Sequence, residues 1–411
     1  MTYQKKKINN LILFLLFFFG CVISYIRASN FSDGDSYSVI LAFLNIIDGG
    51  NYTPSRGAYG HPVPEFLIGF FSYFFGTPFS NIFCFLLFFV SMIILFKTFC
   101  KSETSLSLFL CLVFSNFYLL FENTNSIDYP IAMFFFSLGL YFLKNEKYFI
   151  SFIFFGITIG SRANFLTFVY PSLMIYFYNE WVNLNFKNIL YSFFTVTVVG
   201  LFFYIPLFIL HNFSIDFLDL PFLKDNNDDS GWYGGPKLTF ESLTPRFLYK
   251  VYLILGIYSW ILYILFFKNI IKKLNFYNRE NLILIFIIFI NLFVFFFMPT
   301  KLLIINPFII FFYLICFNTL KNSQIIFLIL FNMLQWFLTY EVADITYKNK
   351  DICLAKNAIK YELKFSINHG KFYQEYFINE DMTKCYSPLM GKYSNNFTNG
   401  KPLILSNLMA K

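Results

Sequence analysis

The chain has 411 residues, of which 57% are hydrophobic, 24% aromatic and 13% charged. Soluble domains carry about 25% charged residues, so this composition excludes a water-soluble globular enzyme and a disordered chain. The formal net charge is +8, but most lysines lie at the ends of apolar runs or in the C-terminal tail. Membrane topology explains that placement better than nucleic-acid binding does. The sequence therefore predicts an all-α polytopic membrane protein whose partners include the lipid bilayer and no nucleic acid.

Apolar runs of membrane length predict about eleven transmembrane helices within residues 1–340. The first run, 11–26, lacks small residues at cleavage spacing, so we expect a retained anchor rather than a signal peptide. Segments 35–47 and 64–76 are predicted to be helices that lie in the membrane interface. The remaining predicted spans are 79–96, 105–121, 129–143, 148–161, 163–178, 188–211, 247–267, 281–297, 302–317 and 325–340.

Charge placement orients these spans. With the N-terminus inside, Lys and Arg outnumber the acids in the inner segments, and acids outnumber them in the outer loops. We therefore expect a cytoplasmic N-terminus and an extracytoplasmic C-terminus, in a membrane that we take to be the bacterial inner membrane. Residues 341–411 are predicted to form a small extracytoplasmic cap, in which Cys353 and Cys385 could pair. The sequence has no CxxC motif or Cys/His cluster, which argues against a zinc site.

Polar residues gather in the outer loops, at predicted headgroup depth. Cations at this depth could hold a phosphate, and a carboxylate could take a proton from an attacking group. The first outer loop, 27–78, and a short second loop supply Asp33, Asp35, Tyr37, Arg56, His61, Glu65 and Asp128. The large outer loop, 212–246, ends at Arg246, and the outer ends of two spans carry Arg162 and Lys301.

Each of these residues also has a structural interpretation. Asp33, Asp35 and Asp128 could be helix caps, and His61 could be a turn residue. Arg162 and Lys301 could be anchors that snorkel to the interface. The acids of the large outer loop could be solvated, or could hold Ca²⁺.

The order of these elements resembles the GT-C superfamily of membrane glycosyltransferases. The similarity is to the protein O-mannosyltransferases and the bacterial aminoarabinose or undecaprenyl-phosphate-sugar transferases. Asp33-Gly-Asp35-Ser-Tyr37 is similar to the family's Asp-Glu-x-x-Tyr motif; Asp33 matches by its distance to Tyr37, and Asp35 is offset by one. His61-Pro-Val-Pro resembles the Pro-Pro-Leu-like start of an interfacial helix.

Three later segments extend the resemblance, which covers roughly residues 10–317. Ile127-Asp128-Tyr-Pro130 resembles a Leu-Asp-Pro-like acid in an outer loop. Gly156-Ile-Thr-Ile-Gly160-Ser-Arg162 resembles a span end of the form Gly-x-x-x-Gly-x-x-x-Arg. Pro299-Thr-Lys301 resembles a Pro-x-Lys/Arg-Tyr entry to a late span, without the Tyr.

The resemblance implies an inverting glycosyltransferase with a module of about seven N-terminal spans and interfacial helices, followed by a variable set of spans. The eleven or so predicted spans of residues 1–340 would then form a GT-C-like bundle. A polyprenyl-phosphate-linked sugar would be the donor, and a lipid, glycan or protein the acceptor. The general base would be an outer-loop aspartate, with Asp33, Asp35 and Asp128 as candidates. No cofactor is certain, although the Asp33-x-Asp35 spacing permits a divalent cation. The resemblance would place the donor phosphate at Arg162, Lys301 and Arg246, and substrate contacts at Tyr37, Arg56, His61 and Glu65.

Two other functions remain open at this stage. An O-antigen-type polysaccharide polymerase or ligase would also have about a dozen spans, with catalytic Arg or His residues in its large outer loop. The segment 212–246 offers Arg246, with His211 just before it. A non-enzymatic transporter would be expected to show two related halves, and the sequence shows no such repeat.

Overall fold

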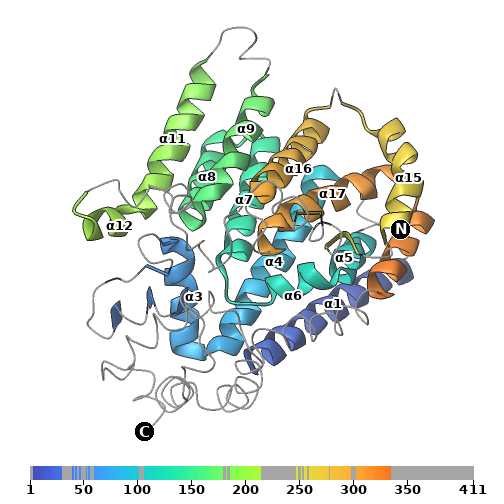
Figure 1. Ribbon diagram of the computed structural model, residues 1–411, viewed down its shortest axis with the longest axis horizontal. Helices are drawn as coiled ribbons and strands as arrows, with labels where there is room; N and C mark the ends of the chain where they lie inside the picture. Colours follow the sequence, from blue (N-terminus) through green and yellow to red (C-terminus); the bar gives the residue numbers. More distant parts are fainter. Residues whose placement is uncertain are drawn as a thin grey trace.

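The described part of the chain is helical and contains no strand (Figure 1). A computed structural model describes residues 3–29, 60–100, 106–178, 186–213, 254–256, 259–276, 278–297 and 302–334. It also describes single residues and pairs at 39–40, 42–43, 46–47, 52, 54–55, 182, 247–248 and 251. The predicted C-terminal cap, with Cys353 and Cys385, lies outside the described residues, as does most of segment 35–47.

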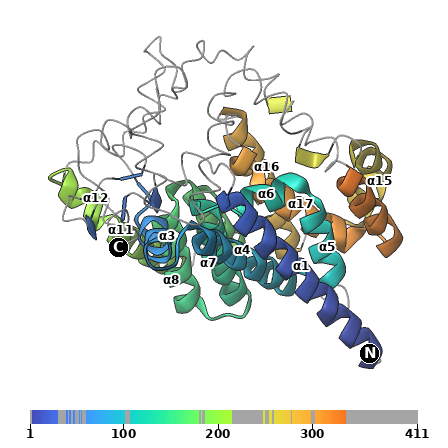
Figure 2. The same ribbon diagram turned by 90° about the horizontal axis from the view of Figure 1, so that it is seen from below.

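The helices follow one another in a bundle whose middle is occupied by α4 and α7 (Figure 1). In Figure 2, α1 runs obliquely past α4 and α5, which it contacts. The labelled helices are α1 (Tyr3–Ser29), α3 (Pro62–Phe75), α4 (Thr77–Phe99), α5 (Leu106–Ser115), α6 (Phe117–Asn123), α7 (Asp128–Lys144), α8 (Tyr148–Ser161), α9 (Leu166–Tyr176), α11 (Lys187–Phe203), α12 (Ile205–Leu210), α15 (Ser259–Lys273), α16 (Arg279–Phe297) and α17 (Asn306–Thr319). Short 3-10 turns, Ala163–Phe165 and Leu302–Ile305, precede α9 and α17, and a further helix spans Asn322–Leu334.

Three described helical segments are long and apolar enough to cross a membrane: Lys7–Tyr25, Pro78–Phe99 and Arg279–Phe296. The bent pair formed by α5 and α6 would be a fourth if it is a single broken span. These helices support a membrane protein. Shorter apolar helices accompany them, so the count of about eleven spans stays a prediction.

The predicted span 105–121 is wrong as one helix, because it bends by 87° between α5 and α6. Asn116 lies at the bend and caps α6, where its Oδ1 accepts a hydrogen bond from the Leu119 backbone N–H (3.1 Å). Its Nδ2 donates to the Ile254 carbonyl (2.8 Å) and to the Tyr313 hydroxyl (2.9 Å). These bonds serve polar groups that a break inside an apolar bundle would otherwise leave unsatisfied. The apolar run by itself does not predict this break, because Ile254 and Tyr313, the partners of Asn116, are distant in sequence.

Two other predicted spans also differ from the structure. The predicted span 188–211 is divided at Tyr204 into α11 and α12. Within the predicted span 247–267, the described residues 247–248, 251 and 254–255 are helical, and α15 (Ser259–Lys273) continues six residues past the predicted end. By contrast, α8 has the predicted bounds 148–161.

The helix ends meet in two groups at opposite ends of the bundle. At one end, the Asn81 Nδ2 of α4 donates to the Ser24 carbonyl of α1 (3.2 Å). At the other end, the Lys144 Nζ of α7 lies 2.8 Å from the Glu280 Oε1 of α16. Which of these two ends faces outward stays a prediction from the charge placement.

Close packing of α8 on α11 depends on two glycines in α8. A Cβ added at Gly156 would lie 2.5 Å from the Val199 Cβ, and one added at Gly160 would lie 2.7 Å from the Phe203 Cβ. Small residues four apart let two apolar helices approach closely, which is a main source of helix association in lipid. This packing fixes the end of α8, and Arg162 follows directly.

Replacing Gly156 by Ala should destabilise the bundle by about 1–3 kcal/mol, because the added methyl group forces α8 away from α11. The measurement is the thermal unfolding of the purified protein in detergent. Val198→Ala, at a half-exposed position on α11, is the matched control and should leave the unfolding temperature nearly unchanged. Equal unfolding temperatures for Gly156→Ala and the unchanged protein would contradict this account of the packing.

Candidate active site

Four of the predicted site residues are described: His61, Glu65, Asp128 and Arg162. They lie at the predicted outer end of the bundle, on α3, on α7 and after α8. The other six, Asp33, Asp35, Tyr37, Arg56, Arg246 and Lys301, lie outside the described residues.

The central contact is an ion pair between Asp128 and Arg162. Asp128 is the first residue of α7, and its Oδ2 accepts a short hydrogen bond from the Arg162 Nη1. The Asp128 side chain is fully buried and that of Arg162 is 13% exposed. The Arg162 guanidinium also lies over the ring of Tyr129, 3.7 Å from its centroid, in a cation–π contact. The start of α7 and the end of α8 are thus held together by this contact.

Asp128 does not occupy the capping position that the sequence left open. The N-cap of α7 is Ile127, and no side chain caps the helix there. A carboxylate in the first turn still interacts favourably with the helix dipole. The Asp128 carboxylate, however, accepts a hydrogen bond from Arg162 at the end of the neighbouring helix α8. Asp128 therefore links two helices rather than capping its own.

His61 extends the pair toward α3. It immediately precedes α3, and its Nε2 lies 3.3 Å from the same Asp128 Oδ2 that contacts Arg162. The side chain is buried. One oxygen of the Asp128 carboxylate therefore contacts both the Arg162 guanidinium and the His61 imidazole. The three side chains come from three separate segments of the chain.

Glu65 is buried in the first turn of α3 and is engaged by the protein itself. Its Oε1 accepts hydrogen bonds from the backbone N–H groups of Ser55 and His61, both at 2.9 Å. Its Oε2 accepts a short hydrogen bond from the Tyr52 hydroxyl. Burial raises the pKa of the Glu65 carboxyl above its ordinary value. Glu65 thus holds the backbone at Ser55 and His61 in place, and its predicted contact with substrate stays a prediction.

Gly60 is required by the same arrangement. A Cβ at this position would lie 2.5 Å from the Glu65 Oε1 and 2.9 Å from the Pro54 Cβ. The backbone of the loop therefore passes directly over the Glu65 carboxyl, which leaves no room for a side chain.

A polar cluster supports the segment that leads into Asp128. The Ser126 hydroxyl donates to the Asn81 Oδ1 (2.6 Å) and hydrogen-bonds to the Ser80 hydroxyl. Ser80 in turn accepts from the Ser72 hydroxyl of α3 (2.9 Å). All four side chains are buried, so α3, α4 and the approach to α7 are locked in one register.

The geometry suits Arg162 for binding an anion. Its Nε is buried and has no hydrogen-bond partner among the described residues, so the guanidinium keeps donor capacity beyond the bond to Asp128. Asp128 is enclosed, and its Oδ2 is shared by two partners. This favours a positioning role for Asp128 over that of a proton acceptor from an outside group.

Sequence reasoning missed Tyr52 and Tyr129 as members of this site. Tyr129 follows Asp128 directly, so adjacency to a candidate acid was the available signal. Tyr52 lies in the first outer loop 13 residues before Glu65, and no spacing rule would have joined the two. In the described segments, no group of three or more His, Cys, Asp or Glu side chains could hold a metal ion.

Comparison with known proteins yields no relative: no family model, no curated protein and no solved structure matches the chain.

Replacing Glu65 by Gln should preserve the fold, whereas Glu65→Ala should destabilise it. Gln keeps an oxygen for the two backbone N–H groups, and its amide can donate to the Tyr52 hydroxyl. Because the folded-state pKa of Glu65 is raised, the unchanged protein loses stability as pH rises through that pKa, and Gln removes this dependence. Thermal unfolding in detergent at several pH values measures both effects. A Glu65→Gln variant that is as unstable as Glu65→Ala at low pH would contradict this role.

Proposed function

We propose that the protein is an inverting glycosyltransferase that uses a polyprenyl-phosphate-linked sugar on the extracytoplasmic side of the membrane. The observation that carries the proposal is the convergence of Asp128, Arg162 and His61 at one end of an apolar helix bundle. A guanidinium fixed at this depth is suited to a lipid-linked phosphate, because it can offer a planar set of N–H donors to phosphate oxygens.

In this proposal, Arg162 binds the donor phosphate and Asp128 positions Arg162. The ion pair and the Tyr129 ring hold the guanidinium in place before the substrate arrives, so little reorganisation is needed during the reaction. Lys301 and Arg246 are proposed as further phosphate ligands from outer segments. Asp33 or Asp35 in the first outer loop is proposed as the general base.

The reaction requires two coupled changes at the anomeric carbon. The base removes a proton from the acceptor hydroxyl or amine as that atom forms a bond to the anomeric carbon. The bond from this carbon to the phosphate oxygen breaks, and the electron pair leaves with the polyprenyl phosphate. Negative charge grows on the phosphate as the bond breaks, so a fixed cation lowers the barrier more than it strengthens ground-state binding.

The general base is tested with Asp33→Asn and Asp35→Asn in the purified protein. Transfer from a labelled polyprenyl-phosphate sugar should fall about 100-fold or more in one of the two variants, because an amide cannot accept the proton. Asp216→Asn, in the large outer loop, is the matched control. Full activity in both variants would overturn the proposed mechanism.

The phosphate role is tested with Arg162→Lys and Arg162→Gln. The lysine variant keeps the charge but loses the planar donor set, so we expect a large loss of transfer with a smaller loss of stability. The glutamine variant should be inactive and also less stable, because it leaves the buried Asp128 carboxylate without its cation. Transfer rate and thermal unfolding are measured on the same samples. Unchanged transfer by Arg162→Lys would argue against phosphate binding by this residue.

A further inference from the structure

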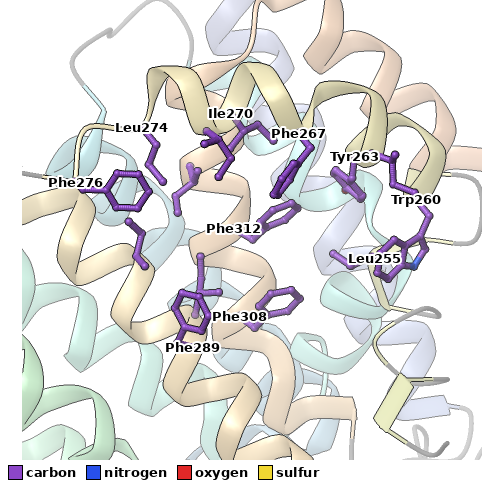
Figure 3. A pocket seen from close by; sticks show the side chains of 15 residues that line it. Leu255, Trp260, Tyr263, Phe267, Ile270, Leu274, Phe276, Phe289, Phe308 and Phe312 are labelled. Atoms are coloured by element: carbon purple, nitrogen blue, oxygen red, sulfur yellow. The ribbon is translucent and has the colours of Figure 1, made fainter.

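A cavity lies between α15, α16 and α17 (Figure 3). Its volume is about 520 Å³, within the range of about 300–1,000 Å³ that ligand pockets occupy. None of the residues that line it is charged, and none belongs to the candidate active site. Aromatic rings from all three helices face the cavity, among them Trp260, Tyr263, Phe267, Phe289, Phe308 and Phe312 (Figure 3).

One end of this cleft is cationic. Leu274, in the turn that follows α15, and Phe276 line the cavity there, and the lysines of the last turn of α15 are exposed beside them. Ile264 lines the cleft, and Lys268, four residues later, lies next to the lining face on the exposed side of α15. Lys272 is exposed one turn further on, two residues before Leu274. Further exposed cations at this end are Lys273, Arg279 and Lys321.

Cations outnumber acids in the described part of this end, where the acids are Glu280 and the exposed Glu146, which lies with Arg279 near Tyr176. Glu280 is the acid on α16, and its carboxylate is engaged by Lys144 of α7 at 2.8 Å. An apolar cleft with a cationic rim is complementary to a molecule with an anionic head and hydrocarbon chains.

The cationic end is remote from the candidate active site. Asp128 begins α7 and Lys144 ends it, and 17 helical residues span about 25 Å. The Lys144–Glu280 contact places the cationic rim at the Lys144 end. A lipid whose phosphate lay at this rim would have its headgroup in the opposite leaflet from a donor held by Arg162.

We propose that the cleft binds an anionic phospholipid of the inner leaflet, with an acyl chain between α15, α16 and α17 and its phosphate beside Lys272 and Lys268. Basic pockets between membrane helices on the cytoplasmic side bind anionic headgroups by this combination of charge and hydrocarbon contact. The proposal does not depend on the glycosyltransferase activity, and either can fail without the other.

The test is native mass spectrometry of the full chain, released from vesicles that contain equal amounts of phosphatidylglycerol and phosphatidylcholine. We expect retained phosphatidylglycerol to exceed phosphatidylcholine. Lys268→Gln combined with Lys272→Gln should weaken that retention about thirtyfold, which corresponds to about 1 kcal/mol per lysine. Lys147→Gln combined with Lys187→Gln removes two exposed lysines outside the cleft rim and is the matched control.

A second variant tests the hydrocarbon contact. Ile288→Trp fills the cleft and should lower the retention of both phospholipids, whereas Val198→Trp on α11 should lower neither. Thermal unfolding in detergent shows that each variant is folded. Equal retention of the two phospholipids by the unchanged protein would overturn the proposal. Displacement of phosphatidylglycerol by equimolar polyprenyl phosphate would also overturn it, and would assign the cleft to a polyprenyl chain instead.

Discussion

One end of the bundle depends on one ion pair, between Asp128 and Arg162. A carboxylate that is fully buried among apolar helices is costly unless a cation meets it, so the start of α7 and the end of α8 must come together. Gly139 lets α7 pack closely on α8, because a Cβ added there would lie 2.5 Å from the Phe155 Cδ1. His61, delivered by the loop that Glu65 organises, then completes the contact from a third segment.

Polar groups in this bundle are gathered into a few enclosed clusters. Ser126 and its partners lock the approach to α7, and Asn116 holds the bend between α5 and α6. Lipid offers no hydrophobic drive between helices, so packing and enclosed hydrogen bonds must supply the specificity of their association. Aromatic side chains fill the space between the clusters; Phe136, for example, lies 5.8 Å from Phe155 and 6.2 Å from Phe311 between ring centroids.

The two proposed lipid sites use cations in different ways. Arg162 is nearly buried, is fixed by Asp128 and is stacked on Tyr129, which suits a group that must be positioned before a reaction. Lys268 and Lys272 are exposed and flexible beside an apolar cleft, which suits a lipid that is held but not transformed. The length of α7 separates the two proposed sites, so the proposed donor site lies at one end of the bundle and the proposed phospholipid site at the other.

Local properties of the sequence determined the helical class, the positions of most helices and the candidate status of Asp128 and Arg162. Apolar runs fix helices because each helix satisfies its own backbone, and α8 accordingly has the predicted bounds. The sequence could not show that Asp128 binds Arg162, that Glu65 is enclosed by Tyr52 and Ser55, or that Asn116 breaks a span. Each of these depends on a partner from another segment, and only the tertiary structure decides which segments meet, because close packing and the need to neutralise buried charge act on neighbours in space.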